Sequence, residues 1–150
     1  MVTMVGNESD VKSLFKNLIQ LEHDAIAAYD AVIEKLDDAG RAQQIREFKG
    51  DHEQHLQELN RLAGDHHAYN PGEGSMKSML TTGKVNFANM TGGDGAILKA
   101  MSTNETDTVT AYRNASQNPE APAEAKPFLE KALADEERHK TWMDDEADRA

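Results

Sequence analysis

Six polar residues have the types and the spacing of a metal centre buried between helices. Apolar residues recur at alternating spacings of three and four along four segments, the pattern of the inward face of a helix. Glutamate and histidine interrupt this pattern at six positions, where a random polar intrusion would bring Lys, Gln, Ser or Asn as readily. The six candidate ligands are Glu22, His52, His55, Glu105, Glu136 and His139.

The donor atoms of these side chains limit the metals that they would bind. The sequence contains no cysteine, so a metal would be held by oxygen and nitrogen, which suits iron, manganese or zinc. Buried carboxylates are very costly without cations nearby, and a pair of divalent ions would supply the positive charge. His52 and His55 lie three positions apart, as do Glu136 and His139, so each pair shares one face of its helix.

We predict that the six residues bind two ions in one layer of a helical bundle. Glu22 and His55 would hold one ion, Glu105 and His139 the other, and Glu136 would bridge them. The usual separation of such paired ions is ~3.5–4 Å. At ~1.5 Å per residue, all six positions lie ~20–28 Å from the nearest predicted turn.

Four segments carry the helical pattern, and strand signals are poor. The predicted helices span residues 10–38, 41–63, 94–116 and 122–147. Asn7 or Ser9 would cap the first helix, and Gly64 would end the second. Pro122 suits the first turn of the fourth helix, and Pro127 would shift its start or bend that turn.

The links between the predicted helices differ in length. Short links at Ala39–Gly40 and at 117–121 predict two antiparallel hairpins. The connector between them is long and rich in glycine, with a short helix expected within Met76–Met90. The sequence therefore predicts an all-α, antiparallel four-helix bundle in one domain, 1–150. Its parts are a helical hairpin at 8–64, a crossover at 65–93 and a helical hairpin at 94–148.

The two hairpins repeat each other in sequence. Residues 22–29 match residues 105–112 at an offset of 83, and residues 51–55 match residues 135–139 at an offset of 84. Near-equal offsets indicate two copies related by a pseudo-twofold axis. Such an axis would place the candidate ligands of the two hairpins at one height.

This arrangement resembles the ferritin-like superfamily of ferritins, rubrerythrins and di-iron oxygenases. In that superfamily two helices each supply one Glu, and the other two each supply a Glu-x-x-His pair. Here Glu22 and Glu105 match the single glutamates, and Glu136 with His139 matches one pair. The His52–His55 pair matches the other, with His in place of Glu. The resemblance covers nearly the whole chain except the crossover and is closest to small bacterial ferritin-like proteins of unassigned function.

The resemblance implies two iron ions that react with oxygen or peroxide, as in Fe(II) oxidation or peroxide reduction during stress defence. His52 departs from the family pattern, leaving three carboxylates where the full pattern offers four. Imidazole also cannot bridge two metals as a carboxylate does. We therefore expect the ion next to His52 to bind less tightly, or to recruit hydroxide or Glu53, and catalysis to be slow or turned toward peroxide.

Two other functions fit the sequence. One is a bundle that uses the site structurally or for zinc, and the other is a stress or interaction protein whose acidic surface and connector bind a partner. The formal charge of −11 argues against a nucleic-acid partner. The sequence shows no signal peptide and no apolar run near the ~20 residues of a membrane span, so a cytoplasmic protein is expected.

Several residues near the candidate ligands have alternative interpretations. Tyr29 and Tyr112, two turns from the single glutamates, fit either a hydrogen bond to the site or ordinary core packing. We expect Asp51 and Glu53, which flank His52, to be surface charges.

Other residues are expected to lie outside the site or to have no chemical role in it. Trp142 fits either beneath the crossover or in the contact of a homodimer. The residues expected to pack or to face solvent are Thr108, His23, His66 and His67.

Overall fold

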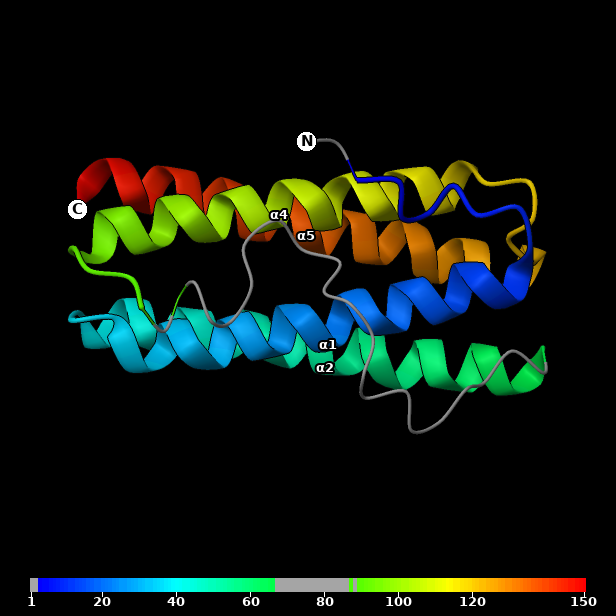
Figure 1. Ribbon diagram of the computed structural model, residues 1–150, viewed down its shortest axis with the longest axis horizontal. Coiled ribbons are helices and arrows are strands. Elements are labelled where there is room, and N and C mark those ends of the chain that lie inside the picture. Colours follow the sequence, from blue (N-terminus) through cyan, green and yellow to red (C-terminus); the bar gives the residue numbers. More distant parts are fainter. Residues whose placement is uncertain (1–2, 67–86, 88) are drawn as a thin grey trace.

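A computed structural model describes residues 3–66, 87 and 89–150 of the chain. Four long helices lie side by side along the long dimension of the molecule (Figure 1). They are α1 (Val11–Lys35), α2 (Ala39–Asp65), α4 (Asp94–Gln117) and α5 (Lys126–Arg149), and the 3-10 turn η1 (Ala123–Ala125) precedes α5. The described residues contain no strand, which confirms the predicted all-α class with four helices.

The helices associate in sequential pairs. The closest pairings are α1 with α2 and α4 with α5. In Figure 1, α2 returns alongside α1 after a short link, and α5 returns alongside α4 in the same way. Most of the predicted crossover at 65–93, including residues 76–86 of the expected short helix, lies outside the described residues. None of the described helices is long and apolar enough to cross a membrane.

Aspartate caps determine where the first two helices start, and both starts differ from the predicted ones. The Asp10 side chain accepts the backbone N–H of Ser13 and so caps α1, where Asn7 or Ser9 was expected. Asp38 does the same for α2 through Arg41, so the link lies at residues 36–38 instead of at Ala39–Gly40. Gly64 lies within α2, which continues to Asp65. The prediction that Gly64 ends this helix is therefore wrong.

Proline sets the start of the last helix. Pro127 stands in the first turn of α5, where its missing N–H leaves no helical hydrogen bond unmade. The predicted start at Pro122 is therefore wrong by one turn. Pro122 instead precedes η1, and α5 begins at Lys126.

Two hydrophobic clusters fill the described bundle, one on each side of a polar layer. Along α1, Leu18 belongs to the first cluster and Val32 to the second, with Glu22 between them. The first cluster includes Leu14, Leu18, Leu59, Leu62, Tyr112 and Leu129. The second includes Val32, Ile45, Phe48, Leu98, Met101 and Met143, and the partly buried Trp142 packs against it. Nonpolar packing therefore closes both ends of the polar layer.

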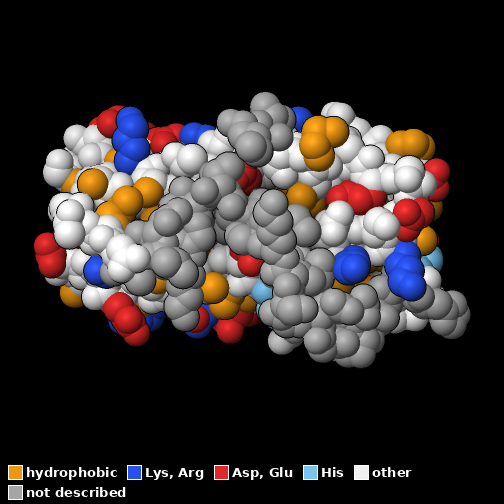
Figure 2. All heavy atoms as spheres, in the orientation of Figure 1, with side chains coloured by type: hydrophobic (Ala, Val, Ile, Leu, Met, Phe, Trp, Pro, Cys, Tyr) orange, Lys and Arg blue, Asp and Glu red, His pale blue; other side chains and the backbone are white. Residues whose placement is uncertain are grey.

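The N-terminal segment packs on the end of α4. Gly6 has φ 97°, and a Cβ there would lie 2.3 Å from the carbonyl oxygen of Ala111, so only glycine fits. Asn118 donates side-chain N–H groups to the carbonyl oxygens of Gly6 and Glu8, both at 2.8 Å. On the face of the molecule in Figure 2, acidic and basic side chains intermingle among the described residues.

Candidate metal centre

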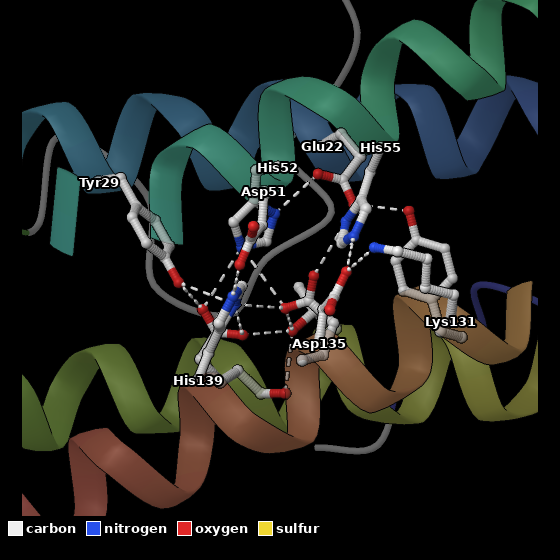
Figure 3. A network of polar contacts seen from close by, with 12 residues as sticks. Glu22, Tyr29, Asp51, His52, His55, Lys131, Asp135 and His139 are labelled. Atoms are coloured by element: carbon white, nitrogen blue, oxygen red, sulfur yellow. Dashed lines mark hydrogen bonds and ion pairs between the residues drawn. The ribbon is translucent and has the colours of Figure 1, made fainter. Parts of the chain in front are cut away.

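The structure brings all six candidate ligands together at the middle of the bundle. Glu22 lies on α1, Glu105 on α4, the two His residues at 52 and 55 on α2, and Glu136 with His139 on α5. The six side chains converge in the space between the helices, as the labelled members show in Figure 3. Each is exposed by 2% or less. The helical period places them inward, and the helix pairing places them at one height.

Their donor atoms form two groups of four, within each of which all atoms lie no more than 4.8 Å apart. One group is Glu22, His52, His55 and Glu136, and the other is His52, Glu105, Glu136 and His139. His52 and Glu136 belong to both groups. Each group contains two carboxylates and two imidazoles, a donor set that suits iron, manganese or zinc.

Two buried atoms of this layer have no hydrogen-bond partner among the described residues. They are Nε2 of His52 and Oε1 of Glu136, both in fully buried side chains. A buried polar atom without a partner costs roughly 1–3 kcal/mol. A metal ion would satisfy both atoms, so the residues present fit the group that the sequence predicts.

The Glu22 carboxylate contacts both histidines of α2. Its Oε2 lies 2.7 Å from Nδ1 of His52, and its Oε1 lies 3.3 Å from Nδ1 of His55. The Tyr112 hydroxyl donates to Oε1 of Glu22 at 2.5 Å. These contacts fix the orientation of the carboxylate.

Glu105 has a different set of neighbours. The Tyr29 hydroxyl donates to its Oε1. The Thr108 hydroxyl lies 2.9 Å from Oε2 of Glu105 and 3.0 Å from Oε2 of Glu136. Nδ1 of His139 lies 3.5 Å from Oε2 of Glu136. Two carboxylates therefore face each other here across one hydroxyl.

Two aspartates outside the predicted ligand set hold the outer nitrogens of the histidines. Oδ2 of Asp51 lies 2.8 Å from Nε2 of His139, and Oδ2 of Asp135 lies 2.8 Å from Nε2 of His55 (Figure 3). A carboxylate on Nε2 keeps its proton there and turns the Nδ1 lone pair toward the centre. The expectation that Asp51 is only a surface charge is therefore wrong. Asp51 and Asp135 match in the sequence repeat, which is the signal that would have found them.

Other expectations near the site have mixed outcomes. Thr108 contacts two carboxylates of the layer, so its assignment to packing alone is wrong. His66 is partly buried, with Nε2 2.7 Å from Oε1 of the exposed Glu124, so its assignment to solvent is only partly correct. His23 and Glu53 are exposed, as expected. His67 lies outside the described residues.

The charges of the layer divide its glutamates into two kinds. Burial opposes the ionisation of Glu22, but His52 and His55 outweigh it and lower the Glu22 pKa. Burial also opposes the ionisation of Glu136, but His52 and other neighbours lower the Glu136 pKa well below its ordinary value. For Glu105, burial and the neighbouring Glu136 raise the pKa to about 7.

The histidines hold protons in place of metal. Burial disfavours a charged His55, but Asp135, Glu136 and Glu22 raise its pKa to about 11. Burial also disfavours a charged His52, and Glu136 and Glu22 raise the His52 pKa well above its ordinary value. The carboxylates of the layer therefore favour protonated, positively charged His52 and His55 when metal is absent.

The helices and this layer define a class: all-α proteins with a buried carboxylate and imidazole centre. The chain belongs to the DUF2383 family, described as a domain of unknown function, whose family model matches residues 10–118. The match includes four of the six candidate ligands and ends before Glu136 and His139. No curated protein and no solved structure matched the chain.

Proposed function

We propose that this protein is a ferritin-like di-metal protein that binds two iron ions and oxidises Fe(II) or reduces peroxide. The observation that carries the proposal is the pair of overlapping donor groups, which share His52 and Glu136 in one buried layer. The course of the helices in Figure 1 supports the antiparallel ferritin-like arrangement and a single domain, 1–150.

The residues of the layer have distinct tasks in this proposal. Glu22 with His55 would hold one ion, Glu105 with His139 would hold the other, and Glu136 would bridge them. Asp51 and Asp135 keep the Nδ1 atoms of His139 and His55 free for metal. The hydrophobic clusters on both sides exclude water from the layer. When bound, iron supplies the electrons that reduce oxygen or peroxide.

Binding of zinc is the second candidate function. It is favoured by the composition of the donor groups, since two carboxylates and two imidazoles suit a tetrahedral zinc site. Zinc has no redox chemistry, so it would give the centre a structural role.

Metal content and absorption after loading test the proposal. The metal-free protein is loaded with Fe(II) without oxygen, desalted, analysed for iron and exposed to air. We expect two iron ions per chain and new near-ultraviolet absorption after air exposure. Glu105→Ala and Glu136→Ala should lose most of the iron, whereas the exposed Glu137→Ala should retain it.

The outcomes separate the candidates. If Glu105→Ala and Glu136→Ala both bind iron like the parent, the centre is not the metal site. If the parent binds zinc in preference to Fe(II) and air causes no spectral change, the zinc role replaces the iron role.

A further inference from the structure

The sequence repeat identifies where the two metal positions differ. Most residues of the layer match like with like across the two hairpins: Glu22 with Glu105, Tyr29 with Tyr112, Asp51 with Asp135 and His55 with His139. Two pairs do not match, because His52 corresponds to Glu136 and Ala25 corresponds to Thr108. These two pairs are the differences in side-chain type between the two halves of the layer.

The two ring nitrogens of His52 face different halves of the centre. Nδ1 lies 2.7 Å from Oε2 of Glu22, a hydrogen-bond distance at which Nδ1–H donates to the carboxylate. Nε2 lies 3.4 Å from Oε2 of Glu136 and 3.6 Å from Oε1 of Glu105. Neutral imidazole with its proton on Nδ1 carries its lone pair on Nε2. The lone pair of His52 therefore faces Glu105, although His52 shares its helix with His55.

We infer that the two metal positions are unequal, with a tight, four-donor position at Glu105 and a weaker, exchangeable position at Glu22. This inference rests on the proposed di-metal function. The Glu105 position has His52 Nε2, Glu105, Glu136 and His139 as donors. The Glu22 position has Glu22, His55 and Glu136, because the nearer nitrogen of His52 donates its proton to Glu22.

Thr108 adds to the inequality. Its hydroxyl lies within hydrogen-bond distance of Glu105 and Glu136 and holds these two carboxylates on the Glu105 side. The matching residue on the Glu22 side is Ala25, which has no hydroxyl. The Glu105 position is thus oriented before metal arrives, which lowers the ordering cost of binding.

The inequality gives each position a role. A position closed by four protein donors retains its metal, whereas a position with three leaves room for an exchangeable ligand. The Glu105 position would therefore keep a resident ion, and the Glu22 position would admit the Fe(II) substrate, which oxygen or peroxide oxidises, and would release Fe(III). This assignment reverses the expectation from sequence that the ion next to His52 is the weaker one.

Titration of the metal-free protein with Co(II), followed by visible absorption and calorimetry, tests the inference. We expect two binding steps. Loss of an outer hydrogen-bond partner of a metal ligand costs ~10–100-fold in affinity. The Glu22 position lacks a whole ligand, His52, so the affinities of the two steps should differ by at least about tenfold. His52→Gln removes the imidazole from the Glu105 position but keeps an amide N–H that can donate to Glu22, so it should weaken the tight step by at least about tenfold and the weak step by less. The matched variant, His55→Gln, should weaken only the weak step.

A second variant keeps the test decisive if His52→Gln does not fold by circular dichroism. Thr108→Val retains the side-chain volume, and it should weaken the tight step and spare the weak one. Equal steps in the parent, or a tight step that survives both His52→Gln and Thr108→Val, would overturn the inference but not the di-metal function. A parent that binds neither Co(II) nor Fe(II) would overturn the di-metal function itself.

Discussion

Replacing Glu105 by glutamine should stabilise the metal-free protein while weakening its metal binding. Burial and the adjacent Glu136 raise the pKa of Glu105 from 4.5 to about 7. The native state therefore keeps this proton to a higher pH than the unfolded chain does. Its stability falls as pH rises from 4.5 to about 7.

The size of the effect follows from the pKa change. Each pKa step of one is worth about 1.4 kcal/mol, so an ionised Glu105 costs the native state up to ~3 kcal/mol above pH 7. Glutamine has the same shape and does not ionise. At pH 8, Glu105→Gln should exceed the parent in stability by up to ~3 kcal/mol, or roughly 6–12 °C in Tm. At pH 4 the two proteins should be nearly equal, because Glu105 is protonated in both states of the parent.

The matched variant is Glu22→Gln, at the equivalent position of the other hairpin. Glu22 accepts hydrogen bonds from His52 and His55, which lower its pKa. Removal of its charge takes one neighbouring anion away from each of two buried imidazoles. Glu22→Gln should therefore destabilise the metal-free protein, although it too should lose metal.

Urea unfolding of chelator-treated protein, followed by circular dichroism at pH 4 and pH 8, measures both changes. A Glu105→Gln variant less stable than the parent at pH 8 would refute the reasoning, because it would show that His52 holds Glu105 favourably ionised. Equal changes in Glu22→Gln and Glu105→Gln would refute the division of the glutamates into two kinds.

Three further predictions concern the contacts of Asp94, the backbone at Gly6 and the protons on the histidines of the layer. Asp94 accepts the backbone N–H groups of Asp37 and Asp38 and pairs with Arg41 at 3.1 Å. Asp94→Asn should therefore lower the unfolding free energy, measured in urea, by ~2–3 kcal/mol. Gly6→Ala should lower it by ~1–3 kcal/mol because φ is 97° there, without changing the metal-to-protein ratio. The increase in Tm caused by Zn(II) should grow from pH 6 to pH 8, because metal must displace protons from histidines such as His55, whose pKa is raised to about 11.

Each of these predictions has a control or a contradicting outcome. Asp30→Asn is the control for Asp94→Asn, because Asp30 pairs with Lys49 and is more exposed than Asp94. It should change the unfolding free energy by less than ~1 kcal/mol. Gly64→Ala is the control for Gly6→Ala, because Gly64 lies in a helix and a Cβ there would meet no other atom within 4 Å. It should raise the unfolding free energy by ~0.5–1 kcal/mol. A Tm increase from Zn(II) that is the same at pH 6 and pH 8 would show that the histidines are neutral before metal binds.

The pH dependence of the metal-free protein has a defined sign on each side of its maximum. The raised pKa of Glu105 makes stability fall as pH rises from 4.5 to about 7, and the raised pKa of His55 makes it fall further as pH rises from 6.5 to about 11. Although burial opposes it, the pKa of Asp51 is lowered by His139 and Arg138, so stability also falls as pH drops through the range below 3.8. Maximum stability is therefore expected near pH 4–5 without metal and at higher pH with it.

The sequence alone predicted the helices and the convergence of the six candidate ligands. Helical periodicity is a local property, so the apolar spacing was enough to turn Glu22 and His52 inward. The repeat, with offsets of 83 and 84, supplied the one long-range relation that placed both hairpins at the same height. Helix ends were less predictable, because Asp10 and Asp38 compete with neighbouring polar residues for the cap.

Only the tertiary structure decided which atoms meet. Asp51 and Asp135 each hold the histidine of the other hairpin, and Tyr29 reaches the glutamate of α4 instead of that of its own helix. The spacing of residues on one helix gives the direction of a side chain, but not which ring nitrogen faces a neighbour. These choices depend on the separation and rotation of helices whose contacting residues lie 76–110 positions apart, which no local sequence pattern contains.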